Sequence, residues 1–179
     1  MLHRRQFILT SAAMLLVAPA QARSDVFVPP RKPRRLHLLA TADGETFRAT
    51  YWADGRYIPE ALVEVSNLLR DRNTGEMCDV DPQLLDFLWQ VQHRLDTPAP
   101  FHVTSGYRSE KTNARLVRRG RAVSRSYHTL GRAADLWLPG RSLEQIRRAA
   151  EHLDCGGVGY YPKSGFVHLD SGPSRCWQS

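Results

Sequence analysis

Two short segments, far apart in the chain, restrict most strongly how this sequence can fold. Residues 126–135 (SYHTLGRAAD) contain His128 and Asp135, and residues 166–170 (FVHLD) contain His168. Two histidines and one carboxylate are ligand types that zinc accepts, and a site with three protein ligands leaves a fourth position open for water. Zinc lowers the pKa of such a water from about 15.7 to roughly 7. The three residues therefore predict a metal-dependent hydrolase, provided that the fold brings the segments together.

The alternation of side chains along a strand gives this grouping a geometric basis. Residues 132–138 alternate as a strand that places Asp135 on one face, and in residues 166–170 His168 shares a face with Asp170. If these two strands are neighbours in a sheet, Asp135 and His168 can meet across the pair.

His128 precedes the first of these strands, and Gly131 lets the chain turn back toward the other two residues. A spacing of seven would also place His128 and Asp135 on one face of a helix. The alternating pattern after Gly131 favours the strand. Residue spacing alone does not exclude the alternative that each histidine has a purely structural role in the fold.

The N-terminus is typical of an export signal rather than of a folded element. Arg4 and Arg5 begin a twin-arginine signature, an apolar run follows, and residues 20–22 (AQA) supply a cleavage site. The alternative is a membrane anchor, but the apolar run is shorter than the roughly 20 residues that a spanning helix needs. We therefore expect residues 1–22 to be a signal peptide that directs the protein to the periplasm by the twin-arginine route, with no membrane span in the mature form.

Composition and charge restrict the remaining chain. Residues 23–35 are rich in proline and basic side chains, which predicts an extended leader, and residues 36–179 are long enough for one domain. Removal of residues 1–22 takes away two arginines and no acid, so the formal charge falls from +7 to +5. Basic residues are not interleaved with aromatic ones as in a nucleic-acid groove, so we expect an anionic cell envelope as the partner and no nucleic acid.

Cysteine usage gives a weaker restriction. Cys78, Cys155 and Cys176 are an odd number for an oxidising compartment, so at most one disulfide can form within the chain. None has the C-x-x-C spacing of a cysteine zinc site. Cys155 with Cys176 is the pair to test first.

The order of predicted elements is mixed, and we expect a single α+β domain whose mainly antiparallel sheet carries packed helices and the zinc site. The expected strands are 36–40, 46–52, 101–105, 132–138, 158–161 and 166–170. The expected helices begin at Pro59, at Pro82 after the N-cap Asp81, at the cap Ser109, and at the capping box of residues 142–145. Residues 118–126, which carry four arginines, are interpreted as an exposed basic loop.

The first of the two segments resembles a known signature. Ser126-x-His128-x-x-Gly131-x-Ala133-x-Asp135 is similar to the S-x-H-x-x-G-x-A-x-D pattern of the zinc peptidases grouped with lysostaphin, D-Ala-D-Ala peptidases and sonic hedgehog. Within that superfamily the chain most resembles the murein endopeptidase K family. The similarity covers nearly the whole chain, including residues 105–109 (SGYRS), 156–162 (GGVGYYP), 172–173 (GP) and Trp177.

The resemblance implies zinc bound by His128, Asp135 and His168, and hydrolysis of peptide crosslinks in murein, the peptidoglycan of the cell wall. It also implies that Arg108 binds substrate and stabilises the developing oxyanion, a role that suits its fixed positive charge. Ser126 would orient the site from beside a ligand. A further expectation is that three tyrosines line the cleft: Tyr107, Tyr160 and Tyr161. We expect the protein to act as a monomer.

One position departs from the wider superfamily. Related D-Ala-D-Ala peptidases have a glutamate three residues before the third ligand as general base, whereas this chain has Gly165. The murein endopeptidase K family shares this feature. Asp170 is the nearest carboxylate on the face of His168, and two roles are open for it: general base, or a residue that holds a histidine ring or caps a loop.

Two other functions compete with a murein endopeptidase. One is a carboxypeptidase that removes terminal D-amino acids, which needs a closed pocket for the free carboxylate. The other is a murein-binding protein without turnover, whose zinc is structural and needs a fourth protein ligand.

Overall fold

The structure is a computed structural model that describes residues 32–179. The expected signal peptide and residues 23–31 of the expected leader lie outside this range. The strands are β1 (Arg34–Ala40), β2 (Thr46–Ala53), β3 (Arg56–Tyr57), β4 (Phe101–Ser105), β5 (Ala133–Trp137), β6 (Gly157–Tyr161), β7 (Phe166–Asp170) and β8 (Arg175–Gln178). The helices are α1 (Pro59–Leu68), α2 (Pro82–Arg94), α3 (Glu110–Arg118) and α4 (Leu143–Leu153), with short 3₁₀ turns η1 (Tyr127–Leu130) and η2 (Pro162–Ser164).

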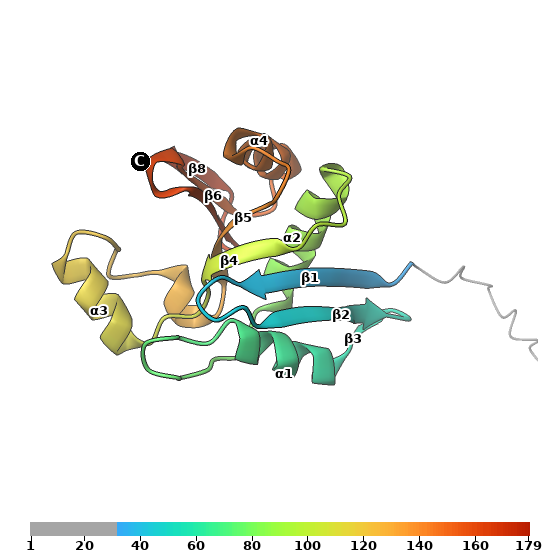
Figure 1. Ribbon diagram of the computed structural model, residues 1–179, viewed down its shortest axis with the longest axis horizontal. Helices are drawn as coiled ribbons and strands as arrows, with labels where there is room; N and C mark the ends of the chain where they lie inside the picture. The colour runs from blue at the N-terminus through green and yellow to red at the C-terminus, as the bar shows by residue number, and fades with distance from the viewer. Residues whose placement is uncertain (1–31) are drawn as a thin grey trace, which may run out of the picture.

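The eight strands of residues 32–179 form one sheet in the order β3-β2-β1-β4-β5-β7-β6-β8 (Figure 1). Most neighbours are antiparallel, but β1 with β4 and β6 with β8 are parallel. The α+β class and the mainly antiparallel sheet are confirmed. Parallel pairing requires a crossover connection between the two strands. Between β1 and β4 this connection includes α1 and α2, and between β6 and β8 it consists of η2, β7 and the loops beside them.

Local signals set the helix ends as the sequence predicts. Asp81 accepts a hydrogen bond from Gln83 N at the start of α2, and Ser109 caps α3 through Thr112 N. Ser142 completes a capping box at the start of α4. These side chains satisfy backbone N–H groups that have no partner within the first helical turn.

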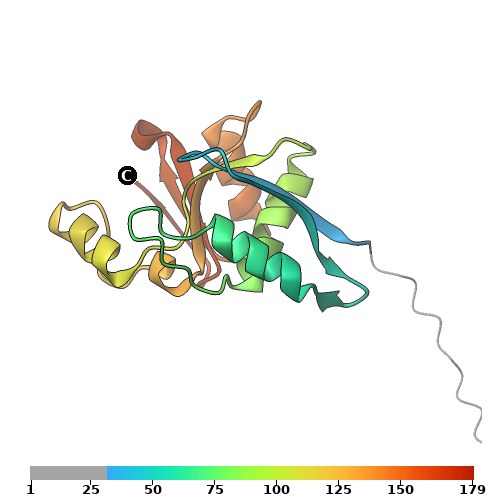
Figure 2. The same cartoon turned by 60° about the horizontal axis from the view of Figure 1, so that its bottom comes forward.

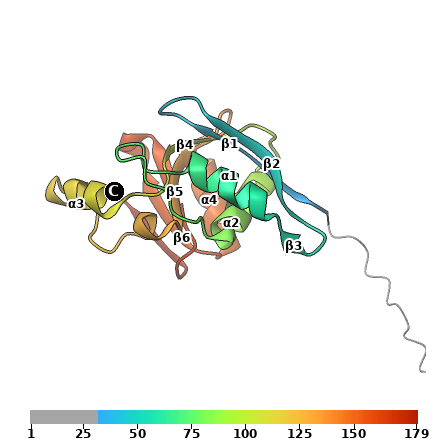
Figure 3. The same cartoon turned by 90° about the horizontal axis from the view of Figure 1, so that it is seen from below.

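Three helices, α1, α2 and α4, cover one face of the sheet and enclose the core (Figure 3). The alternate positions Ala134 and Leu136 on β5, and Val167 and Leu169 on β7, are buried in this core. Because side chains alternate along a strand, residues 135, 168 and 170 belong to the opposite face. That face carries the candidate site.

The fourth helix, α3, stands at one end of the molecule, away from the other three helices (Figures 1 and 2). Its buried residues are polar, Thr112 and Asn113. In residues 32–179 no helix has both the length and the apolar character needed to cross a membrane.

The structure extends the sequence-based picture at three places. Strand β1 begins at Arg34, two residues earlier than expected, because Arg34 pairs with Asp86 at 2.6 Å and stacks over Trp52. Strands β3 and β8 were not expected, since two or four residues give too short an alternation to recognise. The three cysteines are free thiols here, and Cys155 Sγ donates to the carbonyl of Leu153 rather than joining Cys176.

Candidate active site

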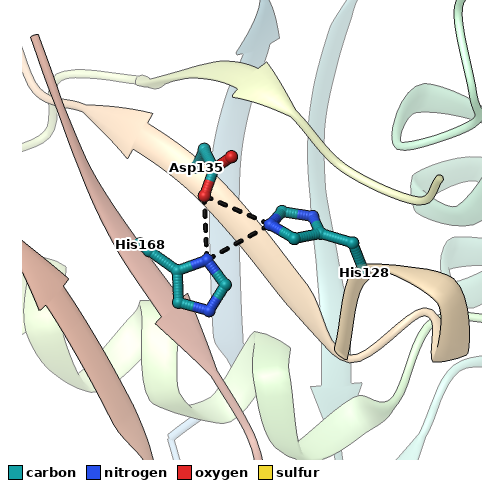
Figure 4. Close-up of side chains that lie close together, drawn as sticks. All are labelled: His128, Asp135 and His168. Atoms are coloured by element: carbon teal, nitrogen blue, oxygen red, sulfur yellow. Dashed lines mark hydrogen bonds and ion pairs between the residues drawn. The ribbon is translucent and has the colours of Figure 1, made fainter. Parts of the chain in front are cut away.

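Three side chains from three elements converge on the open face of the sheet (Figure 4). His128 comes from η1, Asp135 from β5 and His168 from β7, and all three are buried. Asp135 and His168 are directly opposed partners in the antiparallel β5–β7 ladder. Strand alternation predicted that Asp135 and His168 can meet if their strands are neighbours, and β5 and β7 are neighbours.

The donor atoms of these residues form a compact triangle. His128 Nε2 lies 3.2 Å from Asp135 Oδ1 and 3.2 Å from His168 Nδ1, and His168 Nδ1 lies 2.8 Å from Asp135 Oδ1. Ligands about 2.0–2.1 Å from a tetrahedral zinc ion are roughly 3.3 Å apart. The triangle therefore fits such an ion after an expansion of a few tenths of an ångström.

The remaining ring nitrogens fix the orientation of both imidazoles. His128 Nδ1 lies 2.6 Å from the carbonyl oxygen of Gly106, and His168 Nε2 lies 2.9 Å from Asp170 Oδ2. A carbonyl and a carboxylate can only accept, so each of these nitrogens carries the hydrogen. When both rings are neutral, their remaining lone pairs point at the centre of the triangle, which is the tautomer that a metal ligand requires.

The charges of the cluster follow from burial and from mutual contact. Complete burial lowers the pKa of His128, which keeps that ring neutral. Burial also opposes the charging of His168, but the hydrogen bonds and charges of Asp135 and Asp170 outweigh it and raise its pKa. Burial opposes ionisation of Asp135 as well, yet the two histidines hold the pKa of its carboxyl well below the usual range. Without a metal, His168 can be protonated on Nδ1, and this N–H then donates a hydrogen bond to Asp135 Oδ1.

Arg108 reaches the other oxygen of the Asp135 carboxylate. Its Nη2 donates to Asp135 Oδ2, and its Nε donates to Ser105 Oγ at 2.9 Å. Within residues 32–179 the Nη1 group has no hydrogen-bond acceptor, and Arg108 lines the cleft above the triangle. Arg108 therefore lies next to the triangle, as expected. Its Nη1 N–H groups make no hydrogen bond within residues 32–179 and can bind a substrate.

Two glycines let the backbone reach the geometry of the site. Gly131 ends η1 with φ +66, and a Cβ there would lie 2.4 Å from the carbonyl oxygen of Asp79. Gly106, whose carbonyl orients His128, is so close to Leu69 that a Cβ would lie 2.4 Å from the Leu69 carbonyl oxygen. A side chain at either position would clash with the backbone of the neighbouring segment, so both close approaches require glycine.

Asp170 is fully buried, and both of its oxygens are engaged. Oδ2 accepts from His168 at 2.9 Å and from Arg175 Nη2 at 2.6 Å, while Oδ1 accepts from Gly172 N at 2.8 Å and from Arg175 Nη1 at 3.0 Å. Burial acts to raise the pKa of this carboxyl, but His168 and Arg175 lower it well below the usual range. Asp170 therefore contacts Nε2 of the His168 ring, whereas Nδ1 of the same ring belongs to the triangle.

A cleft of about 770 Å³, open to solvent, lies over the triangle. The segment between α3 and η1 forms one wall, and aromatic side chains of the β6–β8 region form the other. The lining side chains with ring or charged groups, besides the triangle, are Arg108, Arg121, Arg125, Tyr127, Tyr161, Phe166, Arg175 and Trp177. A volume of this size suits a peptide segment.

Among the tyrosines expected in the cleft, Tyr161 lines it, and its hydroxyl accepts a hydrogen bond from Trp177 Nε1 at 2.8 Å. Tyr160 packs against the core instead, because its position on β6 is on the face of the helices. Tyr107 is not among the lining residues. Ser126 lines the cleft, and its carbonyl accepts from Thr129 N at 3.0 Å, which holds the turn that carries His128.

Sequence reasoning did not identify Arg175 or the Gly106 carbonyl as parts of the site. A backbone carbonyl has no residue signature, so its role could not be read from the chain. Arg175 follows Asp170 by five residues, and only the pairing of β8 with β6 brings it back to that carboxylate.

The family of the chain follows from comparison with known proteins. Residues 28–177 match the family described as Peptidoglycan L,D-endopeptidase MepK. The chain belongs to this family. The resemblance inferred from the sequence motifs is thereby confirmed, and with it the assignment of the chain to the peptidoglycan peptidases.

Individual members of the MepK family are similar over most of their length. Peptidoglycan L,D-endopeptidase MepK of Escherichia coli K12 is 42% identical, over 90% of this chain and 88% of that protein. The probable peptidoglycan L,D-endopeptidase MepK of Haemophilus influenzae is 37% identical, over 82% of this chain and 80% of that protein. A solved structure, the L-Ala D-Glu endopeptidase ChiX of Serratia marcescens, is 25% identical, with a TM-score of 0.34 over 42% of this chain and 62% of that one.

Proposed function

We propose that this chain is a zinc-dependent endopeptidase that hydrolyses peptide crosslinks of murein in the periplasm. The observation that carries the proposal is the triangle of His128, Asp135 and His168 at the floor of an open cleft. The names of its relatives, which are peptidoglycan L,D-endopeptidases, support the substrate.

The proposed zinc ligands are His128 Nε2, His168 Nδ1 and one oxygen of Asp135. The donor set is chemically suitable, and the separations of 2.8 to 3.2 Å fit the edges of a small tetrahedron. When bound, zinc would supply a Lewis acid that polarises the scissile carbonyl and lowers the pKa of a water. No other His, Cys, Asp or Glu of residues 32–179 joins this group, which supports an open fourth position and argues against a closed structural site.

The proposed role of Arg108 is to bind the carbonyl oxygen of the scissile peptide as negative charge develops on it. Arg108 lines the cleft, its Nη1 makes no hydrogen bond within residues 32–179, and its contacts with Ser105 and Asp135 hold the guanidinium in place before substrate binds. A donor that is already oriented stabilises the transition state without reorganisation.

For Asp170 the contacts support the orienting role rather than that of general base. Its four hydrogen bonds occupy both oxygens, its side chain is fully buried, and Arg175 favours its ionised form. A carboxylate that holds the distal nitrogen of a metal-binding histidine strengthens that ligand and fixes its tautomer. Arg175 thus donates to Asp170, Asp170 accepts from His168 Nε2, and the other nitrogen of His168 faces the proposed metal position.

The shape of the cleft supports an endopeptidase over a carboxypeptidase. A carboxypeptidase needs a closed pocket for a chain end, whereas this cleft is open and bounded by two walls. Of the two crosslinks, the 3-3 bond between diaminopimelates runs from an L centre to a D centre, and the 4-3 bond from D-alanine runs between D centres. The names of the relatives therefore favour the 3-3 crosslink as substrate.

The proposal includes export and processing. Residues 1–22 act as a twin-arginine signal peptide, the residues from 23 to the start of β1 at Arg34 connect the cleavage site to the domain, and the mature chain acts as a monomer. The twin-arginine pair Arg4-Arg5 and the A-x-A site support this route.

Digestion of purified murein by the mature protein tests the function. We expect zinc-loaded protein to convert crosslinked muropeptides to monomers, which liquid chromatography with mass spectrometry identifies by mass and by crosslink type. A His168→Ala variant serves as the inactive control. Wild-type protein that binds murein but releases no muropeptide would support the binding protein, and release of terminal D-amino acids alone would support the carboxypeptidase.

A further inference from the structure

The cleft is lined by far more positive than negative charge. Among residues 32–179, four arginines contribute to its walls, and the only acidic side chain in the lining is Asp135. Two of the four are committed to carboxylates of the protein, Arg108 to Asp135 and Arg175 to Asp170. The other two, which lie on the wall between α3 and η1, are Arg121 and Arg125.

Arg121 and Arg125 have no counter-ion in the part of the chain that the structure describes. Within residues 32–179 neither guanidinium makes an ion pair or a hydrogen bond to another residue, and both side chains are exposed. Arg118 and Arg119 are exposed and likewise make no ion pair within residues 32–179, but they do not line the cleft. Position on the cleft wall is what distinguishes Arg121 and Arg125. Two unpaired positive charges beside a proposed catalytic centre are therefore available to a ligand.

The wall that carries these arginines is held in place by the rest of the structure. Asn113, which is buried, donates from Nδ2 to the carbonyl oxygens of Val123 at 3.1 Å and Ser124 at 3.3 Å. At the other end, Arg121 N donates to the carbonyl of Leu116 at 2.9 Å. The backbone between the two arginines is thus fixed to α3, the helix that stands apart in Figure 2.

We propose that Arg121 and Arg125 form a carboxylate-binding subsite that recognises free carboxylates of the peptide next to the scissile bond. This inference rests on the proposed function, because murein stem peptides carry free carboxylates on D-glutamate and on diaminopimelate. A guanidinium binds a carboxylate with two parallel hydrogen bonds, and the surrounding positive charge strengthens the attraction. The subsite would select stems with free carboxylates over stems whose carboxylates are amidated.

Equilibrium binding of a synthetic stem peptide tests the subsite without turnover. The probe is L-Ala-γ-D-Glu-diaminopimelate with free carboxylates, compared by calorimetry with the same peptide carrying amides in their place. The protein is the zinc-loaded mature chain, as wild type and as the double variant Arg121→Gln with Arg125→Gln. The control is Arg118→Gln with Arg119→Gln, which removes two exposed arginines of the same region that do not line the cleft.

We expect wild-type protein to bind the free-carboxylate peptide roughly tenfold more tightly than the amidated one, as two partly exposed charge pairs permit. The double variant should lose this preference, the control should keep it, and higher salt should reduce it. The inference is overturned if wild type binds both peptides equally or binds neither, if the double variant keeps the preference, or if the control loses it as well.

The same proteins separate this inference from the proposed function. If wild-type protein cleaves murein crosslinks but shows no preference between the peptides, the carboxylate-binding subsite is excluded and the endopeptidase function stands. If wild-type protein prefers the free-carboxylate peptide but releases no muropeptide, the endopeptidase function is excluded and the carboxylate-binding cleft stands.

Discussion

Arg108 and His168 bind opposite oxygens of a single carboxylate, that of Asp135. Oδ2 accepts from Arg108, while Oδ1 faces His168 Nδ1 at 2.8 Å and His128 Nε2 at 3.2 Å. One residue thus links the proposed metal position to the proposed oxyanion donor. The position of the Arg108 guanidinium relative to the scissile bond is therefore set by the same side chain that would bind the metal.

Replacement of Arg108 tests the oxyanion role. Arg108→Ala should retain zinc but reduce kcat by roughly 10²–10³-fold at saturating zinc, the loss seen when one preorganised donor is removed. Steady-state cleavage of a purified crosslinked muropeptide measures this change. Arg148→Ala, on the exposed side of α4, is the matched control, and equal activity of the two variants would remove Arg108 from the mechanism.

Metal content tests the ligand triangle. Mature protein should retain about one zinc per chain after dialysis, and His128→Ala or His168→Ala should abolish retention, because two remaining ligands hold the ion too weakly. Atomic emission measures the stoichiometry. His152→Ala changes an exposed histidine on α4 and should have no effect. Full zinc in both ligand variants would exclude the site.

Asp170→Asn distinguishes orientation from base catalysis. The amide is nearly isosteric but is a poorer acceptor for His168 Nε2–H, so zinc affinity should fall roughly 10–100-fold. Turnover should return when zinc is added to saturation. The measurements are a zinc competition titration and muropeptide release at saturating zinc. Zinc affinity like that of wild type, together with lost turnover, would instead identify Asp170 as the base.

Zinc binding should release a proton near neutral pH. The carboxylates of Asp135 and Asp170 raise the pKa of His168 above its ordinary value of 6.5. At pH 6.5 the metal-free His168 ring is therefore mostly the imidazolium, with a second proton on Nδ1 besides the one on Nε2. A ligand nitrogen must lose this proton, and zinc affinity should therefore rise with pH until the raised pKa is passed. Calorimetry in buffers of different ionisation enthalpy counts the proton. Binding without proton release at pH 6.5 would contradict the assignment.

A matched pair of glycines tests the backbone turn before β5. Gly131→Ala should lower the free energy of unfolding by about 3 kcal/mol, since it combines a positive φ with a Cβ that meets the Asp79 carbonyl. Gly120→Ala has the same φ of +66 but open space around its Cβ, and should cost about 1 kcal/mol. Urea unfolding of the metal-free proteins gives both values. Equal losses would show that the close approach at Gly131 carries no cost.

Several features of this protein were determined by the sequence alone because they depend on neighbouring residues. Caps such as Asp81 and Ser142 bond to the backbone within one helical turn, so helix starts could be predicted from a few letters. The period of two in β5 and β7 likewise placed Asp135 and His168 on the site face. The motif around His128 indicated the family, which the comparisons confirm.

Other features were decided by tertiary structure. Which strands are neighbours, and in which register, depends on packing over the whole sheet, so the direct opposition of Asp135 and His168 and the parallel pairing of β8 with β6 could not be obtained from local pattern. That pairing carries Arg175 to Asp170. The loop of residues 118–126 was recognisable as basic and exposed, but only the contacts of Asn113 place its arginines on the cleft wall. Local patterns report what a residue does to its own backbone, whereas a site depends on long-range contacts that the folded sheet creates.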